Sequence, residues 1–203
     1  VATLQAVRRW QWLAIVLATL FVALLSSLAW RQWRKSKRLR DLTLLDPLTG
    51  IANRPGIERE AARALDAAIR DDTPLSLLML YLDHFKAIND RYGHAAGDKV
   101  LRAVTAAWQA QLRGRDPLGR VGGEEFVVVC PDTSLEQALV VAGRLREATN
   151  ALRFDDIDPA LRVGVSIGAA QARKAGDSCD SLLDRADAAL YRAKQQGRDR
   201  VES

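Results

Sequence analysis

The sequence predicts an α+β domain, an α/β sandwich in which a mixed sheet core is flanked by helices, preceded by one transmembrane helix. Three observations lead to this fold class. Apolar segments of helical and strand type follow one another along the chain in the order α-β-α-ββ-α-β-α. Two of the strand segments are joined by Gly122-Gly123 and form an antiparallel hairpin, which requires a mixed sheet. Residues 13–29 carry no charged side chain.

The first part of the domain contains a turn-rich segment, a helix and a strand. Residues 41–54 include Pro47 and Gly50, which interrupt any helix. A helix is expected over 55–70, because apolar side chains recur there on one face. Residues 75–82 are almost continuously apolar, which is typical of a short strand buried on both faces.

The remaining elements follow from the same two periodicities. They are a helix over 97–113, a hairpin over 120–130, a helix that Ser134 and Gln137 open with capping-box spacing, a strand over 161–168, and a final helix that ends near Gln196 before Gly197. The strand alternates strictly, with Leu161, Val163, Val165 and Ile167 on one side.

Residues 10–30 form the expected transmembrane helix. These 21 residues give a helix about 31 Å long at about 1.5 Å per residue, which matches a hydrocarbon core about 30 Å thick. Tryptophans lie at both ends, as in aromatic belts: Trp10, Trp12, Trp30 and Trp33. A buried core helix and a signal peptide are the alternatives. Arg and Trp at both ends argue against the first, and a poor cleavage site at Ser27-Leu28-Ala29 argues against the second.

The net charge of +5 over 203 residues is a difference between two regions. Residues 1–40 contain eight bases and no acid, whereas residues 41–203 contain 22 bases and 25 acids, a net charge of −3. Two bases precede the span and six follow it, so the positive-inside rule places residues 31–203 in the cytoplasm, at the inner membrane. The unpaired Cys130 and Cys179 suit a reducing cytoplasm. The acidic body argues against nucleic-acid binding.

Four parts are therefore expected. They are an extracytoplasmic end of a longer N-terminal part (1–9), the transmembrane helix (10–30), a basic juxtamembrane linker (31–45) and the soluble domain (46–203). The linker is expected to lie on anionic lipid headgroups.

Three motifs in the soluble domain carry chemistry. Residues 122–126, GGEEF, place two carboxylates at a turn between strands, which is suited to a divalent cation, although many such turns only carry solvated acids. Polar side chains follow the strand 75–82, and a carboxylate there can accept both hydrogen bonds that guanine offers from N1–H and N2–H. Lys194 and Arg198 lie at the end of the last helix, where cations can hold a triphosphate or merely complement the helix dipole.

Together these motifs resemble the GGDEF family of diguanylate cyclases, over about residues 41–203. The matching segments are DPLTGIANR (46–54), LDHFKAINDRYGHAAGDKVL (82–101), GGEEF (122–126), SIGAA (166–170) and ADAALYRAKQQGRDRV (186–201). The resemblance implies a sheet core like that of adenylyl cyclases and polymerase palms. It also implies condensation of two GTP molecules into cyclic di-GMP with release of pyrophosphate. Because the product has two equivalent bonds, two copies must meet in a homodimer.

The resemblance also implies roles for individual residues. Glu124 and the carbonyl of Leu82 would bind Mg²⁺ or Mn²⁺, with Asp83 reaching the ion through water, and Glu124 and Lys86 would act in catalysis. Guanine would be held by Asn89, His94 and Asp98. The phosphates would be held by Phe85, Lys86, Lys194 and Arg198.

One position departs from the family pattern. The family's strand ends in Asp-x-Asp-x-Phe-Lys, and its first Asp supplies a metal ligand, whereas this chain has Tyr81 there. Two hypotheses follow: an active cyclase whose activity Tyr81 reduces, and an impaired domain that binds cyclic di-GMP or GTP without turnover.

A further resemblance concerns regulation. Arg113 and Asp116 form an R-x-x-D motif at the spacing of the family's product-inhibition site, and Arg144 matches an arginine that completes this site from a second domain. Arg can pair with phosphate and stack on guanine. Cyclic di-GMP is therefore expected both as the product and as an allosteric ligand.

Overall fold

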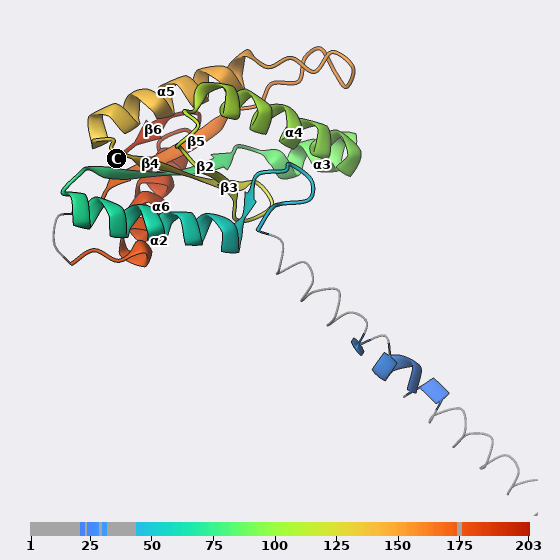
Figure 1. Cartoon of the computed structure of the whole chain (residues 1–203). Coiled ribbons are helices and arrows are strands. Elements are labelled where there is room, and N and C mark those ends of the chain that lie inside the picture. The colour runs from blue at the N-terminus through green and yellow to red at the C-terminus, as the bar shows by residue number, and fades with distance from the viewer. Residues whose placement is uncertain (1–20, 23, 29, 32–43, 174–175) are drawn as a thin grey trace, which may run out of the picture. The chain divides into compact units, whose positions relative to one another are not determined.

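The computed structural model describes residues 21–22, 24–28, 30–31, 44–173 and 176–203, and residues Leu44–Ser203 form one compact domain (Figure 1). Most of the predicted span (10–30) and of the linker (31–45) lies outside the described residues. The described residues between 21 and 31 are helical and exposed. Within the described part of the chain, no helix is both long and apolar enough to cross a bilayer.

A six-stranded mixed sheet forms the centre of the domain, in the order β1-β3-β4-β2-β5-β6 (Figure 1). The strands are β1 (Ala52–Asn53), β2 (Leu75–Leu82), β3 (Leu118–Arg120), β4 (Glu125–Pro131), β5 (Val165–Gln171) and β6 (Val201–Glu202). The central β2 pairs antiparallel with both β4 and β5, while the short edge strands β1 and β6 pair parallel with β3 and β5. The predicted mixed sheet is therefore confirmed.

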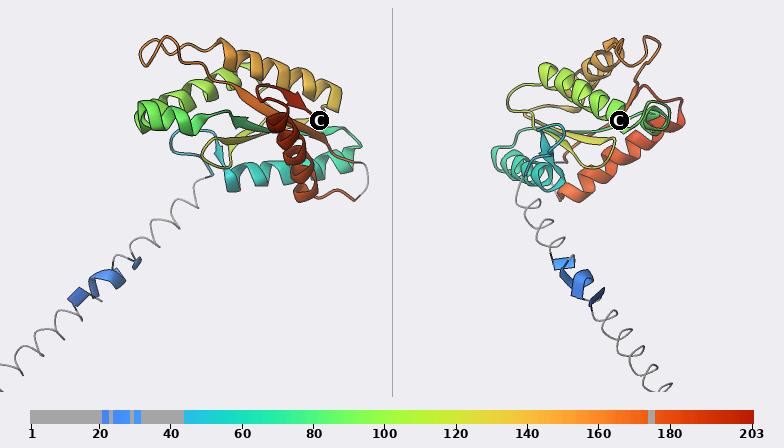
Figure 2. Two further views of the ribbon diagram at one scale, coloured as in Figure 1. Left: turned by 180° about the vertical axis from the view of Figure 1, so that it is seen from behind. Right: turned by 90° about the vertical axis from the view of Figure 1, so that its right-hand side faces the viewer.

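Helices cover both faces of this sheet (Figure 2). The helices are α2 (Arg54–Asp71), α3 (Phe85–Tyr92), α4 (His94–Gln111), α5 (Leu135–Ala151) and α6 (Cys179–Gln195). Alternate β2 residues enter opposite cores. Leu78, Leu80 and Leu82 pack with α3, α4 and α5, whereas Leu75 and Leu77 pack with α2 and α6. Burial on both faces explains why this strand is apolar at nearly every position.

The helix ends confirm some local predictions and correct others. Ser134 and Gln137 form the predicted capping box of α5. The helix predicted over 97–113 begins earlier, at His94, and the eight-residue α3 before it was not predicted. The strand predicted over 161–168 is shifted, because β5 begins at Val165 and Leu161 is buried from a loop instead.

Gly168 allows α6 to lie directly against β5. A Cβ at this position would overlap the main chain of Ala186 and Leu190, so no larger residue fits without a shift of the helix. This close packing determines where the C-terminal end of α6, with Lys194, meets the end of the sheet.

Candidate functional site

The candidate site lies at the end of the sheet where β2 ends and β4 and β5 begin. Tyr81 stands opposite Glu125 on β4 and opposite Ser166 on β5. Because both neighbours of β2 are antiparallel, their first residues meet the last residues of β2. The backbone therefore brings Tyr81, Glu124 and Ser166 to one end of the sheet, although they are far apart in sequence.

Tyr81 contacts two of the predicted site residues. Its hydroxyl donates a hydrogen bond to Oε1 of Glu124 at 2.9 Å. Nζ of Lys194 lies 3.3 Å from the centroid of the Tyr81 ring. This cation–π contact is worth about 0.5–1 kcal/mol at an exposed site and about 2 kcal/mol when it is desolvated. Tyr81 thus links Glu124 on one side with the Lys194 ammonium on the other.

Burial and neighbouring charge shift both ionisable groups of this contact. Burial raises the pKa of Tyr81 above its ordinary value of 10.0, and the hydrogen bond to Glu124 raises it further, so the phenol is neutral at physiological pH. Burial lowers the pKa of Lys194, while the carboxylates of Glu125, Asp187, Asp83 and Glu124 oppose this by favouring its charged form.

Asp83 is buried, with 5 % of its surface exposed, and is bound within the protein. Ser166 Oγ donates to both of its carboxylate oxygens, at 2.8 and 3.0 Å, and the backbone N–H of Asp199 donates to Oδ2 at 3.0 Å. These bonds tie the C-terminal segment to the end of β2. Metal ligation by Asp83 stays a prediction, and both of its oxygens already have partners.

The donor set around Glu124 fits one divalent ion and not a site built from several carboxylates. No group of three or more His, Cys, Asp or Glu side chains in the described ranges is arranged to hold a metal. Glu124 is half-buried, and its backbone carbonyl accepts from the N–H of Leu82 at 3.1 Å, so the Leu82 main chain lies beside it. Glu124 can supply one carboxylate and Leu82 one carbonyl.

The predicted guanine-binding residues lie on the α3–α4 pair. Gly97 has no room for a side chain, because a Cβ there would overlap the amide of Asn89 and approach the ring of Phe85. This contact holds α3 and α4 together and fixes the half-buried Asn89 near Asp98 of α4. His94, at the start of α4, and Lys86, at the start of α3, are exposed.

Arg198 lies in the turn after α6, in the left-handed region with φ 62°. Its backbone N–H donates to Ala193 at 3.0 Å. Together with Asp83 and His84 it lines a cavity of about 460 Å³ between the end of β2 and the C-terminal segment. Within the described residues, no hydrogen bond or ion pair joins Arg198 to Tyr81 or Glu124, so Arg198 is not part of their cluster.

Arg120 positions the GGEEF turn and was missed from the sequence. Its guanidinium donates to the carbonyl of Gly122 at 3.2 Å and to that of Gly123 at 2.7 Å, and it pairs with Asp46 at 3.3 Å. Burial opposes ionisation of Asp46, but hydrogen bonds from Thr49 and the charge of Arg120 outweigh it and lower the pKa of Asp46. The sequence signals that pointed to this contact were an arginine two residues before Gly122 and an acid in the 46–54 motif.

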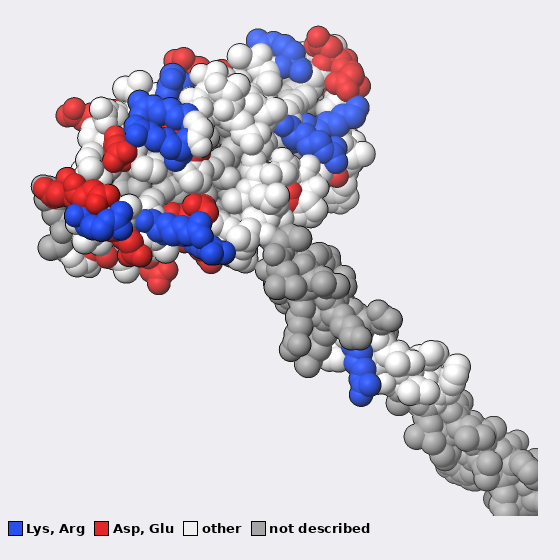
Figure 3. Space-filling model, in the orientation of Figure 1, with Lys and Arg blue, Asp and Glu red and all other residues white. Residues whose placement is uncertain are grey.

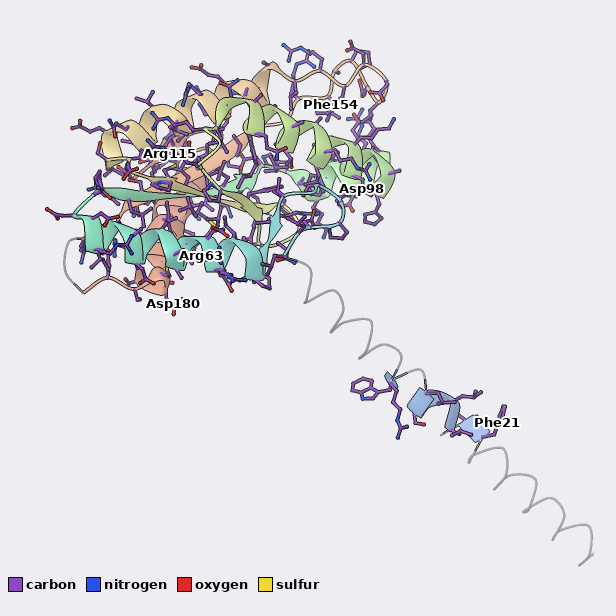
Figure 4. The ribbon with its side chains drawn as sticks, in the orientation of Figure 1. Phe21, Arg63, Asp98, Arg115, Phe154 and Asp180 are labelled. Carbon is purple, nitrogen blue, oxygen red and sulfur yellow. The ribbon has the colours of Figure 1, made fainter. Side chains whose placement is uncertain are left out.

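The predicted inhibitory site lies at the other end of α4 from Asp98, as Asp98 and Arg115 show in Figure 4. Asp116 is buried, and its Oδ2 accepts from the backbone N–H of Arg113 at 3.0 Å. Its Oδ1 is also buried and has no hydrogen-bond partner in the described part of the protein. Arg113 and Arg144 are exposed, and in the part of the chain that the structure describes no hydrogen bond or ion pair joins Arg144 to the Arg113–Asp116 turn.

Basic and acidic side chains lie in mixed groups on the face of the domain shown in Figure 3, with uncharged surface between the groups, and neither sign covers the face continuously. This distribution agrees with the small net charge of residues 41–203.

Comparisons with known proteins agree on one family. The family model for "Diguanylate cyclase, GGDEF domain" matches residues 43–200. The chain is 42% identical over 163 residues to the diguanylate cyclase DgcP of Pseudomonas aeruginosa, covering 80% of this chain and 24% of DgcP. It is 33% identical over 195 residues to the probable diguanylate cyclase DgcC of Escherichia coli, covering 94% of this chain and 52% of DgcC. The chain thus spans between a quarter and a half of these relatives.

The fold comparison gives the same result. The crystal structure of the GGDEF domain of DgcB from Caulobacter crescentus, in complex with c-di-GMP, superposes with a TM-score of 0.75 at 32% identity. The match covers 79% of this chain and 95% of the DgcB domain.

Replacing Asp83 with Ala is expected to lower the free energy of unfolding by about 2–3 kcal/mol, because it leaves the Ser166 hydroxyl and the Asp199 N–H without an acceptor. Urea unfolding followed by circular dichroism measures this. Asp90→Ala, at an exposed position of α3, is the matched control and should change stability by less than about 0.5 kcal/mol. Equal stabilities for the two variants would contradict the structural role of Asp83.

Proposed function

The chain belongs to the GGDEF family, and on this premise we propose that it condenses two molecules of GTP into cyclic di-GMP with release of two pyrophosphates. The observation that supports this most directly is the position of Glu124. The GGEEF turn holds the half-buried Glu124 at the end of the central strand, where its carboxylate accepts from the Tyr81 hydroxyl and its backbone carbonyl accepts from the N–H of Leu82.

Guanine recognition is assigned to the α3–α4 pair. The Asp98 carboxylate can accept from guanine N1–H and N2–H, and the amide of Asn89 can bind the same base edge. The contact of Gly97 with Asn89 and Phe85 orders this surface before any nucleotide arrives. Adenine lacks the donor pair, so a preference for GTP over ATP follows.

The triphosphate is assigned to cations from two elements. Lys86 lies in the first turn of α3, where the free N–H groups of the helix also favour an anion. Lys194 and Arg198 come from the end of α6 and the turn after it. His84, in the left-handed region with φ 56°, turns the chain from β2 into α3 and so directs these N–H groups past the end of the strand.

The metal requirement of the family is met in this proposal by one divalent ion, Mg²⁺ or Mn²⁺, at Glu124 and the Leu82 carbonyl. When bound, the ion would supply charge stabilisation for the reacting phosphate. Glu124 is also the carboxylate placed to accept the proton of an attacking 3′-hydroxyl. Because each domain holds one GTP and the product has two equivalent phosphodiester bonds, turnover requires two copies face to face in a homodimer.

A second candidate function is that of a GTP or cyclic di-GMP binding module without turnover. Tyr81 favours it, because a neutral phenol stands where the family pattern has a metal-binding carboxylate. Nucleotide binding with no product formation would identify this function.

Incubation of the dimeric protein with GTP and Mg²⁺ or Mn²⁺ should yield cyclic di-GMP, measured by chromatography, whereas ATP should give no cyclic product. Glu124→Gln should lower the rate at least about a hundredfold, because it removes both the proton acceptor and the metal carboxylate. Glu136→Gln, at an exposed position in the first turn of α5, is the matched control. The cyclase assignment fails if wild-type protein yields no product at high concentration.

We also propose that product inhibition acts through Arg113, Asp116 and Arg144. Arg113, which is exposed next to Asp116, supports this, because a guanidinium can pair with phosphate and stack on guanine. Arg113→Ala should raise the cyclic di-GMP concentration needed for half-inhibition at least about tenfold, since it removes a phosphate-binding guanidinium. Arg115→Ala is the matched control, because Arg115 is exposed and pairs with Asp132 instead. An unchanged inhibition curve for Arg113→Ala would rule this site out.

We also propose that residues 10–30 attach the protein to the membrane, with the domain in the cytoplasm. The uncharged segment and the basic residues on either side of it support this proposal. The protein should stay in the membrane pellet after washing with carbonate, which removes peripheral proteins. Replacing both Leu17 and Leu24 with Arg should release it, because charges at the centre of a span are strongly unfavourable. Replacing Lys35 and Lys37 with Gln is the control for simple headgroup binding. Wild-type protein in the carbonate supernatant would contradict a span.

A further inference from the structure

Tyr81 brings a protein cation to the place where the family pattern supplies a carboxylate. We infer that the Lys194 ammonium, held on the ring of Tyr81, acts as a fixed cation for the bound nucleotide and makes nucleotide binding largely independent of a divalent ion. This inference rests on the proposed function, since it assumes that the site holds GTP, and it deepens that proposal by assigning the origin of the positive charge.

The position of the ammonium is determined by contacts on both sides. The Tyr81 hydroxyl donates to Glu124 at 2.9 Å, which holds the far end of the Tyr81 side chain, and Lys194 Nζ lies 3.3 Å from the centroid of its ring. The close packing of α6 on Gly168 fixes the helix that carries Lys194. Lys194 is half-buried, so its position is restricted more than that of an exposed lysine.

The side chain of Tyr81 points to Lys194 because of strand alternation. Tyr81 follows Leu77 and Met79 on the face of β2 that α6 and α2 cover. A shorter Asp side chain at this position would offer no aromatic ring to the ammonium, and Glu124 would lose the phenol as its donor. The contact is therefore specific to the residue by which this chain departs from the family pattern.

The net charge of the site is also less negative than in the family pattern. With Tyr81 neutral, Glu124 and Lys194 have opposite charges, whereas an Asp at this position would add a negative charge next to Glu124. Two adjacent carboxylates attract a divalent ion and repel a triphosphate unless that ion is present. Without that added carboxylate, and with a fixed ammonium, the site attracts the ion less and repels the free nucleotide less.

The test measures nucleotide affinity with and without metal. The probe is a GTP analogue with a methylene group between the α- and β-phosphorus atoms, which cannot be condensed. Calorimetry on the full chain gives its Kd in EDTA and in saturating Mg²⁺. For the wild type the two values should agree within about fivefold, whereas Tyr81→Asp should show a difference of about fiftyfold or more, the scale of one added charge at short range.

Two further variants separate the ring from the hydroxyl. Tyr81→Phe keeps the ring under Lys194 and should bind in EDTA nearly as the wild type does. Tyr81→Leu and Lys194→Gln should each weaken binding in EDTA about tenfold, because the fixed cation is released or lost. Tyr92→Phe and Lys99→Gln are matched controls, since they break a tyrosine–carboxylate and a lysine–carboxylate contact elsewhere in the domain.

Equal metal dependence in the wild type and Tyr81→Asp, with both folded by circular dichroism, would overturn the inference. If Tyr81→Asp does not fold, an unchanged affinity of Tyr81→Leu in EDTA would overturn it instead. Absence of any analogue binding would overturn both the inference and the proposed function. Metal-independent binding together with absence of cyclic di-GMP would support the inference and contradict only the cyclase assignment.

Discussion

The antiparallel pairing of β2 with both of its neighbours is the constraint on which the site depends. It places the last residues of one strand beside the first residues of two others, so that Tyr81, Glu124 and Ser166 meet at one end of the sheet. Helices buried against both faces hold this register, because a slip of one residue would exchange the two faces of β2. The composition of the site therefore depends on the pairing and register of the sheet.

The acidic side chains near the end of β2 and the GGEEF turn have different structural roles. Asp83 is buried and holds the C-terminal segment through Ser166 and Asp199, and Asp46 holds Arg120, which in turn binds the carbonyls of the Gly122–Gly123 turn. Glu124 keeps a half-buried carboxylate at the site. The structural acids bind to protein donors and thereby position the turn and the strand end beside which Glu124 lies.

The sequence predicted the elements whose buried faces have a clear period, namely α2, β2, α5 and α6. It missed α3, because only Phe85 and Ile88 of this short helix are buried, and it shifted β5, because Leu161 and Val163 alternate with polar residues while they pack from a loop. The roles of Glu124 and Asn89 were predicted from motifs and stay predictions. The contact of Lys194 with Tyr81 could not be predicted, because it depends on how closely α6 packs on Gly168.

Trp108 allows the core of this domain to be followed by tryptophan fluorescence. It is completely buried, its ring packs edge-on against Phe126 with centroids 5.0 Å apart, and its Nε1 donates to Thr149 at 2.8 Å. The other four tryptophans of the chain, at positions 10, 12, 30 and 33, precede the domain. In residues 44–203 tryptophan emission therefore arises from a single ring in the core, on the sheet face opposite to Tyr81 and Lys194. Its spectrum reports whether this core is intact, and a ligand bound at the surface of the domain cannot touch the ring, because the ring is completely buried.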